Sequence, residues 1–235
     1  MNDLLIKELA IDWDEIEQDS YLHSIPSIKS LDSLSFKKHI TFFVGCNGTG
    51  KSTLLEAMAI AYGYNPEGGT RNFHFSTYDS HSDLHKALTL VKGPRARWGY
   101  FLRAETFYNV ATVGINDYEE TGFIHERSHG EGFMHVIKKN LNPMSIYFFD
   151  EPEAALSPDR QLALIKEIHD CAEDGSQFFI ISHSPILLAT PDAEILSFDG
   201  DTIRPIPYEE TESYKIYSTF LNNKDSILHH LLSDI

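Results

Sequence analysis

Short apolar runs alternate with longer amphipathic segments along the chain. Three runs are apolar at consecutive positions rather than alternate ones: 39–45 (HITFFVG), 145–150 (SIYFFD) and 177–183 (QFFIISH). Runs of this length that are rich in β-branched and aromatic residues are typical of strands buried on both faces. Segments with apolar residues at helical spacing lie between them, as at 51–63 and 158–175. The pattern predicts an α/β fold with a mainly parallel sheet flanked by helices.

The remaining segments predict smaller elements. Strands are expected at 4–13 and 97–105, helices at 81–93, 133–140 and 212–232, and a hairpin at 194–206 around Asp199-Gly200-Asp201. The stretch ERSHGEGF, at 126–133, contains two glycines and is expected to be a loop, because glycine is a poor start to a helix.

Composition limits the class of protein. The chain has 235 residues, of which 42% are hydrophobic, which is enough for one well-buried core. We expect a single domain over 1–235, with a helical subdomain at approximately 76–142 and a C-terminal hairpin and helix at 194–235. The two cysteines predict neither a disulfide framework nor a metal site. The sequence shows no signal peptide and no membrane span, so a cytoplasmic location is expected.

The net charge of −16 disfavours broad binding to nucleic acid, because a uniformly acidic surface repels phosphate. One loose basic cluster stands out, formed by Lys92, Arg95, Arg97 and Arg103. It is either a local DNA contact or a solvated loop and strand edge.

The segment GCNGTGKS, from Gly45 to Ser52, carries the clearest chemistry. It fits the phosphate-loop pattern G-x-x-x-x-G-K-[ST] and stands between a predicted strand and a predicted helix. Glycines let the backbone turn its N–H groups toward phosphate oxygens, and the helix N-terminus adds partial positive charge. The residues expected to bind nucleotide here are Gly45, Asn47, Gly48, Thr49, Gly50, Lys51, Ser52 and Thr53.

Individual side chains of this loop have separate expected roles. Lys51 bridges the β- and γ-phosphates, Ser52 offers its hydroxyl to Mg²⁺, and Thr53 reaches the α-phosphate. Cys46 occupies a free position of the loop, where it is either a redox sensor or a tolerated small residue.

Two later strands end in polar residues that suit the same reaction. Asp150 stands at the carboxyl end of one strand, where it can hold the Mg²⁺ shell, and Glu151 follows as the expected general base. His183 ends the next strand, where a neutral imidazole can hydrogen-bond the γ-phosphate or the attacking water. Taken alone, the acidic pair could equally be a solvated turn after a strand.

The ordered set GCNGTGKS, RSHGE, FFDEPEAALSP and IISHSP resembles the ATP-binding-cassette (ABC) superfamily of P-loop ATPases. Within it, the chain looks like the soluble SMC- and RecF-like branch and the compact bacterial ATPases without a coiled coil. Transporter subunits usually have Thr where this chain has Glu153, and Asp where it has Ser157. The resemblance implies an antiparallel β element at the N-terminal side and a helical signature subdomain.

The same resemblance implies Mg²⁺-dependent ATP hydrolysis, with Glu151, His183 and Lys51 as catalytic residues. Ser128 and Gly130 correspond to the signature motif, in which one subunit closes over the γ-phosphate bound by a second. The implied assembly is an ATP-dependent, head-to-tail homodimer. His129 and Glu131 depart from the usual signature residues.

Other sites are less complete. No glutamine lies between the phosphate loop and the signature, so the family's Q-loop Gln is missing from its interval, and Glu105 is our substitute metal ligand. Trp13 or Tyr21 is expected to stack on adenine unless it belongs to the core. Arg71 is expected to meet either a phosphate or a carboxylate.

Three functions remain open from the sequence. The first is a soluble ATPase switch for DNA repair, genome maintenance or anti-phage defence, with an effector protein or DNA as partner. The second is the ATP-binding subunit of a membrane transporter. The third is a nucleotide sensor without hydrolysis, which the presence of both Glu151 and His183 disfavours.

Overall fold

A six-stranded sheet forms the centre of the computed structural model, which describes residues 3–70, 82–103 and 129–233. The strand order is β5-β6-β7-β3-β8-β9; the first five strands run parallel and the short β9 is antiparallel to β8. The strands are β3 (Ile40–Val44), β5 (Gly99–Arg103), β6 (Ile146–Asp150), β7 (Gln177–Ile181), β8 (Ala193–Ser197) and β9 (Arg204–Pro205). The predicted α/β fold with a mainly parallel sheet is confirmed.

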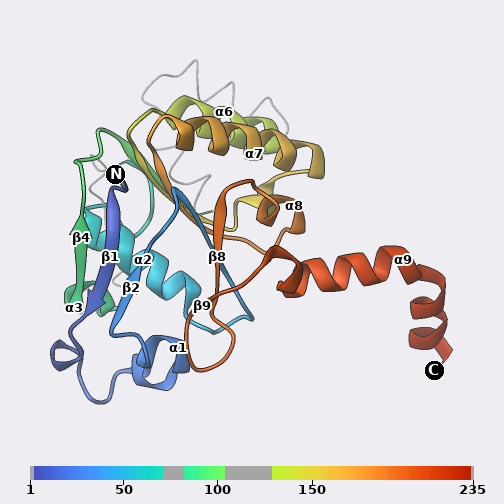
Figure 1. The fold of residues 1–235 in the computed structure, drawn as a ribbon, viewed down its shortest axis with the longest axis horizontal. Coiled ribbons are helices and arrows are strands. Elements are labelled where there is room, and N and C mark those ends of the chain that lie inside the picture. The colour runs from blue at the N-terminus through green and yellow to red at the C-terminus, as the bar shows by residue number, and fades with distance from the viewer. Residues whose placement is uncertain (1–2, 71–81, 104–128, 234–235) are drawn as a thin grey trace.

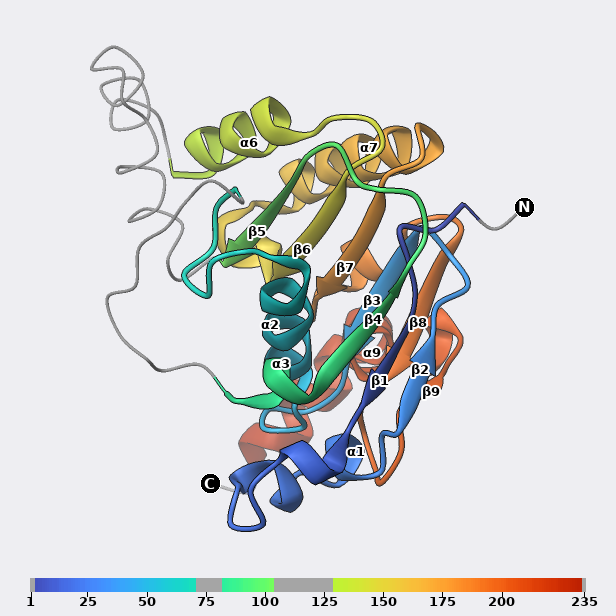
Figure 2. The same ribbon diagram turned by 90° about the vertical axis from the view of Figure 1, so that its left-hand side faces the viewer.

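A separate three-stranded antiparallel sheet has the order β2-β1-β4. It comprises β1 (Ile6–Ile11), β2 (Ser33–Ser35) and β4 (Leu88–Lys92). This is the antiparallel element that the family resemblance implied at the N-terminal side. Helix α2 (Lys51–Tyr62) lies between the two sheets (Figure 2), and its buried face packs in one core with side chains of both.

The opposite face of the large sheet is covered by α6 (His129–Asn140) and α7 (Pro158–Glu173), which run side by side (Figures 1 and 2). Alternate side chains of each central strand serve the two cores. Phe148 stacks on Phe179 toward α2, at 5.5 Å between ring centroids, while Tyr147 stacks on Phe178 toward α7 at 4.7 Å. Both faces of these strands are therefore dry, as their unbroken apolar sequence predicts.

Short helices complete the connections. They are η1 (Trp13–Glu15), η2 (Tyr21–Ser24), α1 (Pro26–Lys29), α3 (Leu84–Ala87), η3 (Pro152–Ala155), α8 (Pro185–Leu188) and η4 (Tyr208–Glu210).

The C-terminal helix α9 (Glu212–Ser233) extends away from the body and bends in its second half (Figure 1). The bend coincides with non-helical backbone angles at Asn223, and none of the helix's residues is buried. Several large apolar side chains are exposed along it, including Leu221 at 74%. None of the helices within the described ranges is long and apolar enough to cross a membrane.

Two predictions about local structure were wrong. The helix expected over 81–93 is only α3, and Leu88–Lys92 form strand β4 instead. Pairing with β1 supplies hydrogen bonds and a half-buried surface that suit Leu-Thr-Leu-Val better than a helix does. The loop expected up to residue 133 also ends early, because α6 begins at His129 and includes two glycines; its buried apolar face outweighs their low helix propensity.

The hairpin around Gly200, the strand ending at Arg103 and the C-terminal helix were predicted correctly. The expected domain and subdomain boundaries stay predictions.

A buried side chain, Gln177, joins the two sheets. Its Oε1 accepts the Ile6 N–H at 2.8 Å, and its Nε2 donates to the Ile6 C=O at 2.9 Å. The amide therefore satisfies both main-chain polar groups of a residue at the start of β1, at a place where water has no access.

We predict that Gln177→Ala lowers the free energy of unfolding by about 3 kcal/mol, because it leaves two buried backbone groups without these partners. Urea denaturation measures the change. The exposed Gln18 is the matched control, and Gln18→Ala should change stability by less than about 0.5 kcal/mol. Equal effects of the two substitutions would contradict the role assigned to Gln177.

Candidate functional site

The phosphate loop connects β3 to α2 through three glycines with positive φ. The angles are +139° at Gly45, +82° at Gly48 and +88° at Gly50, a region that other residues seldom adopt. Gly50 is also confined by its surroundings, because a Cβ there would lie 2.5 Å from Cγ1 of Ile28 in α1. All three glycines thus have a conformational reason, and Gly50 has a steric one as well.

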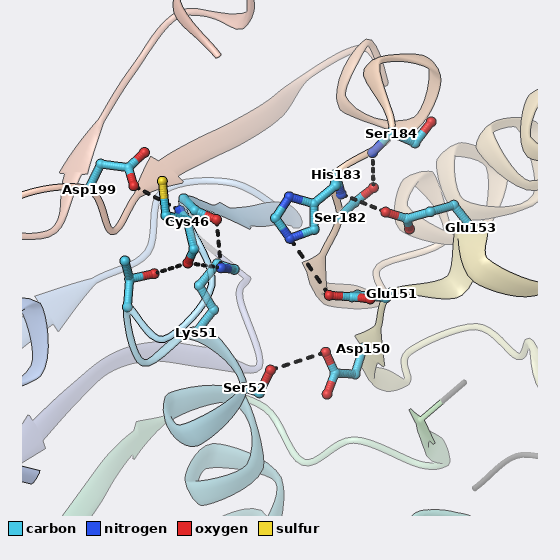
Figure 3. A network of polar contacts seen from close by, with 12 residues as sticks. Cys46, Lys51, Ser52, Asp150, Glu151, Glu153, Ser182, His183, Ser184 and Asp199 are labelled. Atoms are coloured by element: carbon cyan, nitrogen blue, oxygen red, sulfur yellow. Dashed lines mark hydrogen bonds and ion pairs between the residues drawn. The ribbon is translucent and has the colours of Figure 1, made fainter. Parts of the chain in front are cut away.

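Lys51, the first residue of α2, points back into the loop (Figure 3). Its ammonium donates to the carbonyl oxygens of Gly45 at 2.6 Å and Cys46 at 2.7 Å, and only 5% of the residue is exposed. Burial lowers the pKa of Lys51, while Asp199 and Glu151 oppose the shift. An ammonium that is poorly solvated and bonded to neutral carbonyls is suited to exchange them for a phosphate anion.

Side chains from distant segments hold the loop. Asp199, which follows β8, accepts the Cys46 N–H at 2.8 Å, and Ser27 donates to the Thr49 C=O at 2.6 Å. Sequence analysis placed Asp199 only in a hairpin; no residue pattern connects it with the phosphate loop. Asp199 also raises the pKa of the exposed Cys46 thiol, and Glu212 adds to the effect. A thiol kept protonated is a poor redox sensor, which favours the interpretation of Cys46 as a tolerated small residue.

Ser52 and Asp150 face each other across the start of α2. The Ser52 hydroxyl lies 3.4 Å from Oδ1 of Asp150, which suits two oxygens on the shell of one small cation (Figure 3). Within the described ranges no group of three or more His, Cys, Asp or Glu could hold a metal. The Ser52 hydroxyl and the Asp150 carboxylate are oxygen donors of the kind that Mg²⁺ takes from proteins together with water and substrate phosphates.

The backbone of Glu151 is left-handed, with φ +50° and ψ +55°, a conformation that residues other than glycine seldom adopt. Its N–H donates to the Ile181 C=O at 3.0 Å, which continues the pairing of β6 with β7 by one residue. The left-handed conformation then turns the side chain toward His183, where Oε1 lies 3.6 Å from the ring Nε2. Both side chains are about half exposed, so a substrate can reach them.

Five of the expected site residues thus lie together at one edge of the sheet, as predicted (Figure 3): Lys51, Ser52, Asp150, Glu151 and His183. Of the signature residues, Gly130 lies near the start of α6, where a Cβ would meet the Arg160 guanidinium and the Ala155 C=O. Glu131 pairs with Arg160 at 3.1 Å. The expected residues Ser128, Glu105 and Arg71 lie outside the described residues.

The two candidates for adenine contact differ. Trp13 donates its Nε1–H to the Leu31 C=O at 3.2 Å and packs against the core, and its ring lies 5.2 Å from that of His23. Tyr21 is 55% exposed. The partners of Trp13 favour the core interpretation for that residue.

The basic cluster is divided among different environments. Lys92 lies over the ring of Tyr62 at 4.7 Å, and Arg103 pairs with Glu56 at 2.6 Å. Arg95 and Arg97 are exposed on the loop between β4 and β5, and Lys92 at the end of β4 is exposed as well.

Comparison with known proteins agrees with this geometry. Residues 21–170 match the family model AAA_23, described as an AAA domain, and the chain belongs to this family. It is an ABC-type P-loop ATPase by family, which confirms the resemblance seen in the sequence.

Curated relatives are similar over most of this chain. The xylose import ATP-binding protein XylG of Thermoanaerobacter pseudethanolicus is 24% identical over 89% of the chain and 47% of its own length. The L-arabinose transport ATP-binding protein AraG of Geobacillus stearothermophilus is 24% identical over 84% of the chain and 44% of its own length. The chain therefore spans about half the length of these relatives. Among solved structures, the SMC head domain from Thermotoga maritima is 13% identical, with a TM-score of 0.44, over 87% of this chain and 99% of that one.

We predict that Gly50→Ala weakens nucleotide binding at least tenfold and costs about 2 kcal/mol of stability, because the Cβ adds backbone strain and a clash with Ile28. Isothermal titration with a nucleotide and urea denaturation measure the two effects.

The control is Gly63→Ala, at the end of α2. Gly63 has φ +109°, but no heavy atom of the described residues lies within 4 Å of the position that a Cβ would take there. This variant should lose about 1 kcal/mol of stability and keep its nucleotide affinity. Unchanged binding in Gly50→Ala would show that the loop tolerates a different shape.

Proposed function

We propose that this chain hydrolyses ATP with Mg²⁺ and acts as a switch through an ATP-bound, head-to-tail homodimer. One observation carries the proposal: three parallel strands bring the phosphate loop, the Asp150-Glu151 pair and His183 to the same sheet edge. A nucleotide-binding loop alone would suit a sensor, whereas an acid beside a histidine at the loop suits hydrolysis.

Each side chain has one task in this proposal. The loop N–H groups and Lys51 bind the triphosphate, while Ser52 and Asp150 hold the metal, which when bound neutralises phosphate charge. Glu151 accepts a proton from the attacking water, and its left-handed backbone aims it away from the metal-holding oxygen of Asp150. His183 orients the water or the γ-phosphate from the other side.

The proposed homodimer is supported by the resemblance of the signature residues to the family motif and by the place of Gly130 at the start of α6. In this fold α6 starts beside η3, which is part of the loop after β6. We propose that Ser128 and Gly130 of one subunit contact the γ-phosphate bound by the other, so that ATP stabilises the interface and hydrolysis releases it.

The biological setting is a further proposal. A role in DNA repair, genome maintenance or anti-phage defence, with an effector protein or DNA as partner, is favoured by the Glu153 form of the loop after Asp150. The alternative, an ATP-binding subunit of a sugar or other transporter, is supported by the similarity to XylG and AraG. Co-purification distinguishes them: a membrane subunit would favour the alternative.

We predict that Glu151→Gln abolishes at least 99% of turnover while ATP still binds, because the amide cannot take the proton from water. With ATP and Mg²⁺ this variant should elute as a dimer in gel filtration. Lys51→Ala is the control, since it should lose nucleotide binding and remain monomeric. A monomeric Glu151→Gln variant at saturating ATP would contradict the sandwich, and normal turnover in Lys51→Ala would contradict the site itself.

We predict that reversing the charge of Arg95 and Arg97 to Glu weakens any DNA binding by at least tenfold at low salt, because they are the two exposed arginines of the basic cluster. Fluorescence anisotropy at two salt concentrations measures it. Lys215→Glu combined with Lys224→Glu on α9 is the control, because it changes the net charge by the same amount. The same DNA affinity in wild type and the reversed variant would reject this patch as the contact.

A further inference from the structure

His183 is held through its main chain by a residue of the loop that follows β6. Its N–H donates to Oε1 of Glu153 at 2.5 Å, while its ring faces Glu151 on the other side (Figure 3). Glu153 lies in η3, two residues after Glu151. The two acidic residues therefore act on different parts of the same histidine, one on the ring and one on the backbone.

The Glu153 carboxyl is largely buried, which is unfavourable for its charged form. Its second oxygen, Oε2, is buried and has no hydrogen-bond partner among the described residues. Burial raises the pKa of Glu153, and the N–H of His183, the N–H of Glu153 and the nearby Ser182 hydroxyl oppose the rise. A buried acceptor that satisfies only one of its oxygens adds little net stability, so its main effect is on where the bonded chain lies.

A second buried side chain makes a parallel connection. Gln161 of α7 donates its Nε2–H to the Leu156 C=O at 3.1 Å, and its Oε1 accepts the hydroxyl of Ser184 at 2.5 Å. The Ser184 oxygen in turn accepts the N–H groups of Ile186 and Leu187 at the start of α8. The residue after His183 is thereby tied to the same loop as His183 itself.

These two bonds help to hold the main chain that carries the ring. The imidazole side chain is 42% exposed and the Glu151 side chain 48%, so neither is fixed by close packing. The distance of 3.6 Å between them depends on where the main chain at His183 and at Glu151 is held. A displacement of about 1 Å at reacting groups can cost up to about a hundredfold in rate.

We propose that Glu153 and Gln161, the switch clamp, are positioning residues that link the loop after Asp150 to His183. This inference rests on the proposed ATP hydrolysis and deepens it. Through the clamp, a movement of residues 152–156 shifts the histidine, so that the loop and the ring change position together. The hydrogen bonds of the clamp go to His183, Ser184 and Leu156 rather than to the phosphate loop, so we expect it to affect the rate and not the binding of nucleotide.

The experiment compares steady-state ATP hydrolysis by Glu153→Ala and Glu153→Gln. The alanine variant should lose kcat on the order of tenfold with an unchanged KM, because the His183 N–H loses its acceptor. The glutamine variant should recover most of that loss, since its amide oxygen can still accept the same N–H. The matched control is Glu194→Ala, because Glu194 also accepts a backbone N–H, from Lys37, at the opposite end of the sheet.

A double substitution separates positioning from a general structural effect. In a His183→Ala background, adding Glu153→Ala should change kcat by less than twofold, because the group to be positioned is gone. Gln161→Leu should behave as Glu153→Ala does in both backgrounds. Losses that multiply in the double variant, or a Glu153→Ala variant with wild-type kcat, would overturn the proposal.

Amide hydrogen exchange tests the contact without turnover. Exchange in a peptide covering 179–186 should accelerate in Glu153→Ala and stay as in wild type in Glu194→Ala. If wild type does not hydrolyse ATP, the proposed function fails, and exchange still decides whether the clamp exists. Unchanged exchange in Glu153→Ala would reject the clamp while leaving the proposed ATPase intact.

Discussion

The site depends on the register of three parallel strands, β3, β6 and β7, which places their carboxyl ends side by side. Phe43 of β3 and Asp150 of β6 are both in register with Ile181 of β7, so these strands end at the same height in the sheet. The residues that follow the three strands must then leave the sheet together, and they include the phosphate loop, Glu151 and His183. A shift by one residue in any strand would also turn its buried apolar side chains to the wrong core. Because both faces of the strands must be buried, the register is fixed, and with it the relative positions of the phosphate loop, Glu151 and His183.

Rigid strands alone do not complete the site, because the loops that follow them adopt conformations that the strands do not impose. Glu151 has a left-handed backbone, and the phosphate loop has three glycines with positive φ. The phosphate loop is held by Asp199 from the segment after β8, and the loop of Glu151 is joined to His183 through Glu153. Such positions cost free energy, and they persist only where several contacts define them together.

The sequence predicted the parts that depend on local pattern. The buried strands, the phosphate loop and the strand-end positions of Asp150 and His183 follow from short motifs, and the structure brings them together. The sequence could not predict contacts between segments that the fold brings together. The composition of Leu88–Lys92 is compatible with a helix or a strand, and pairing with β1 makes the segment a strand. Asp199 and Gln161 carry no signal in the sequence, because Asp199 accepts an N–H from a residue 153 positions away and Gln161 joins Leu156 to the Ser184 hydroxyl of another segment.

The charge distribution around Lys51 bears on the form in which nucleotide enters. One largely buried ammonium has three acidic neighbours that act on it: Asp199, Glu151 and Asp150. The loop therefore does not present a strongly positive site to a triphosphate, and the whole chain carries a net charge of −16. A free polyanion would meet repulsion from these carboxylates at the moment of binding. A triphosphate already complexed with a divalent cation meets less, because the cation offsets the charge of Asp150 and of the phosphates at the same point. The acidic surroundings of Lys51 thus favour the metal-bound nucleotide over the free one.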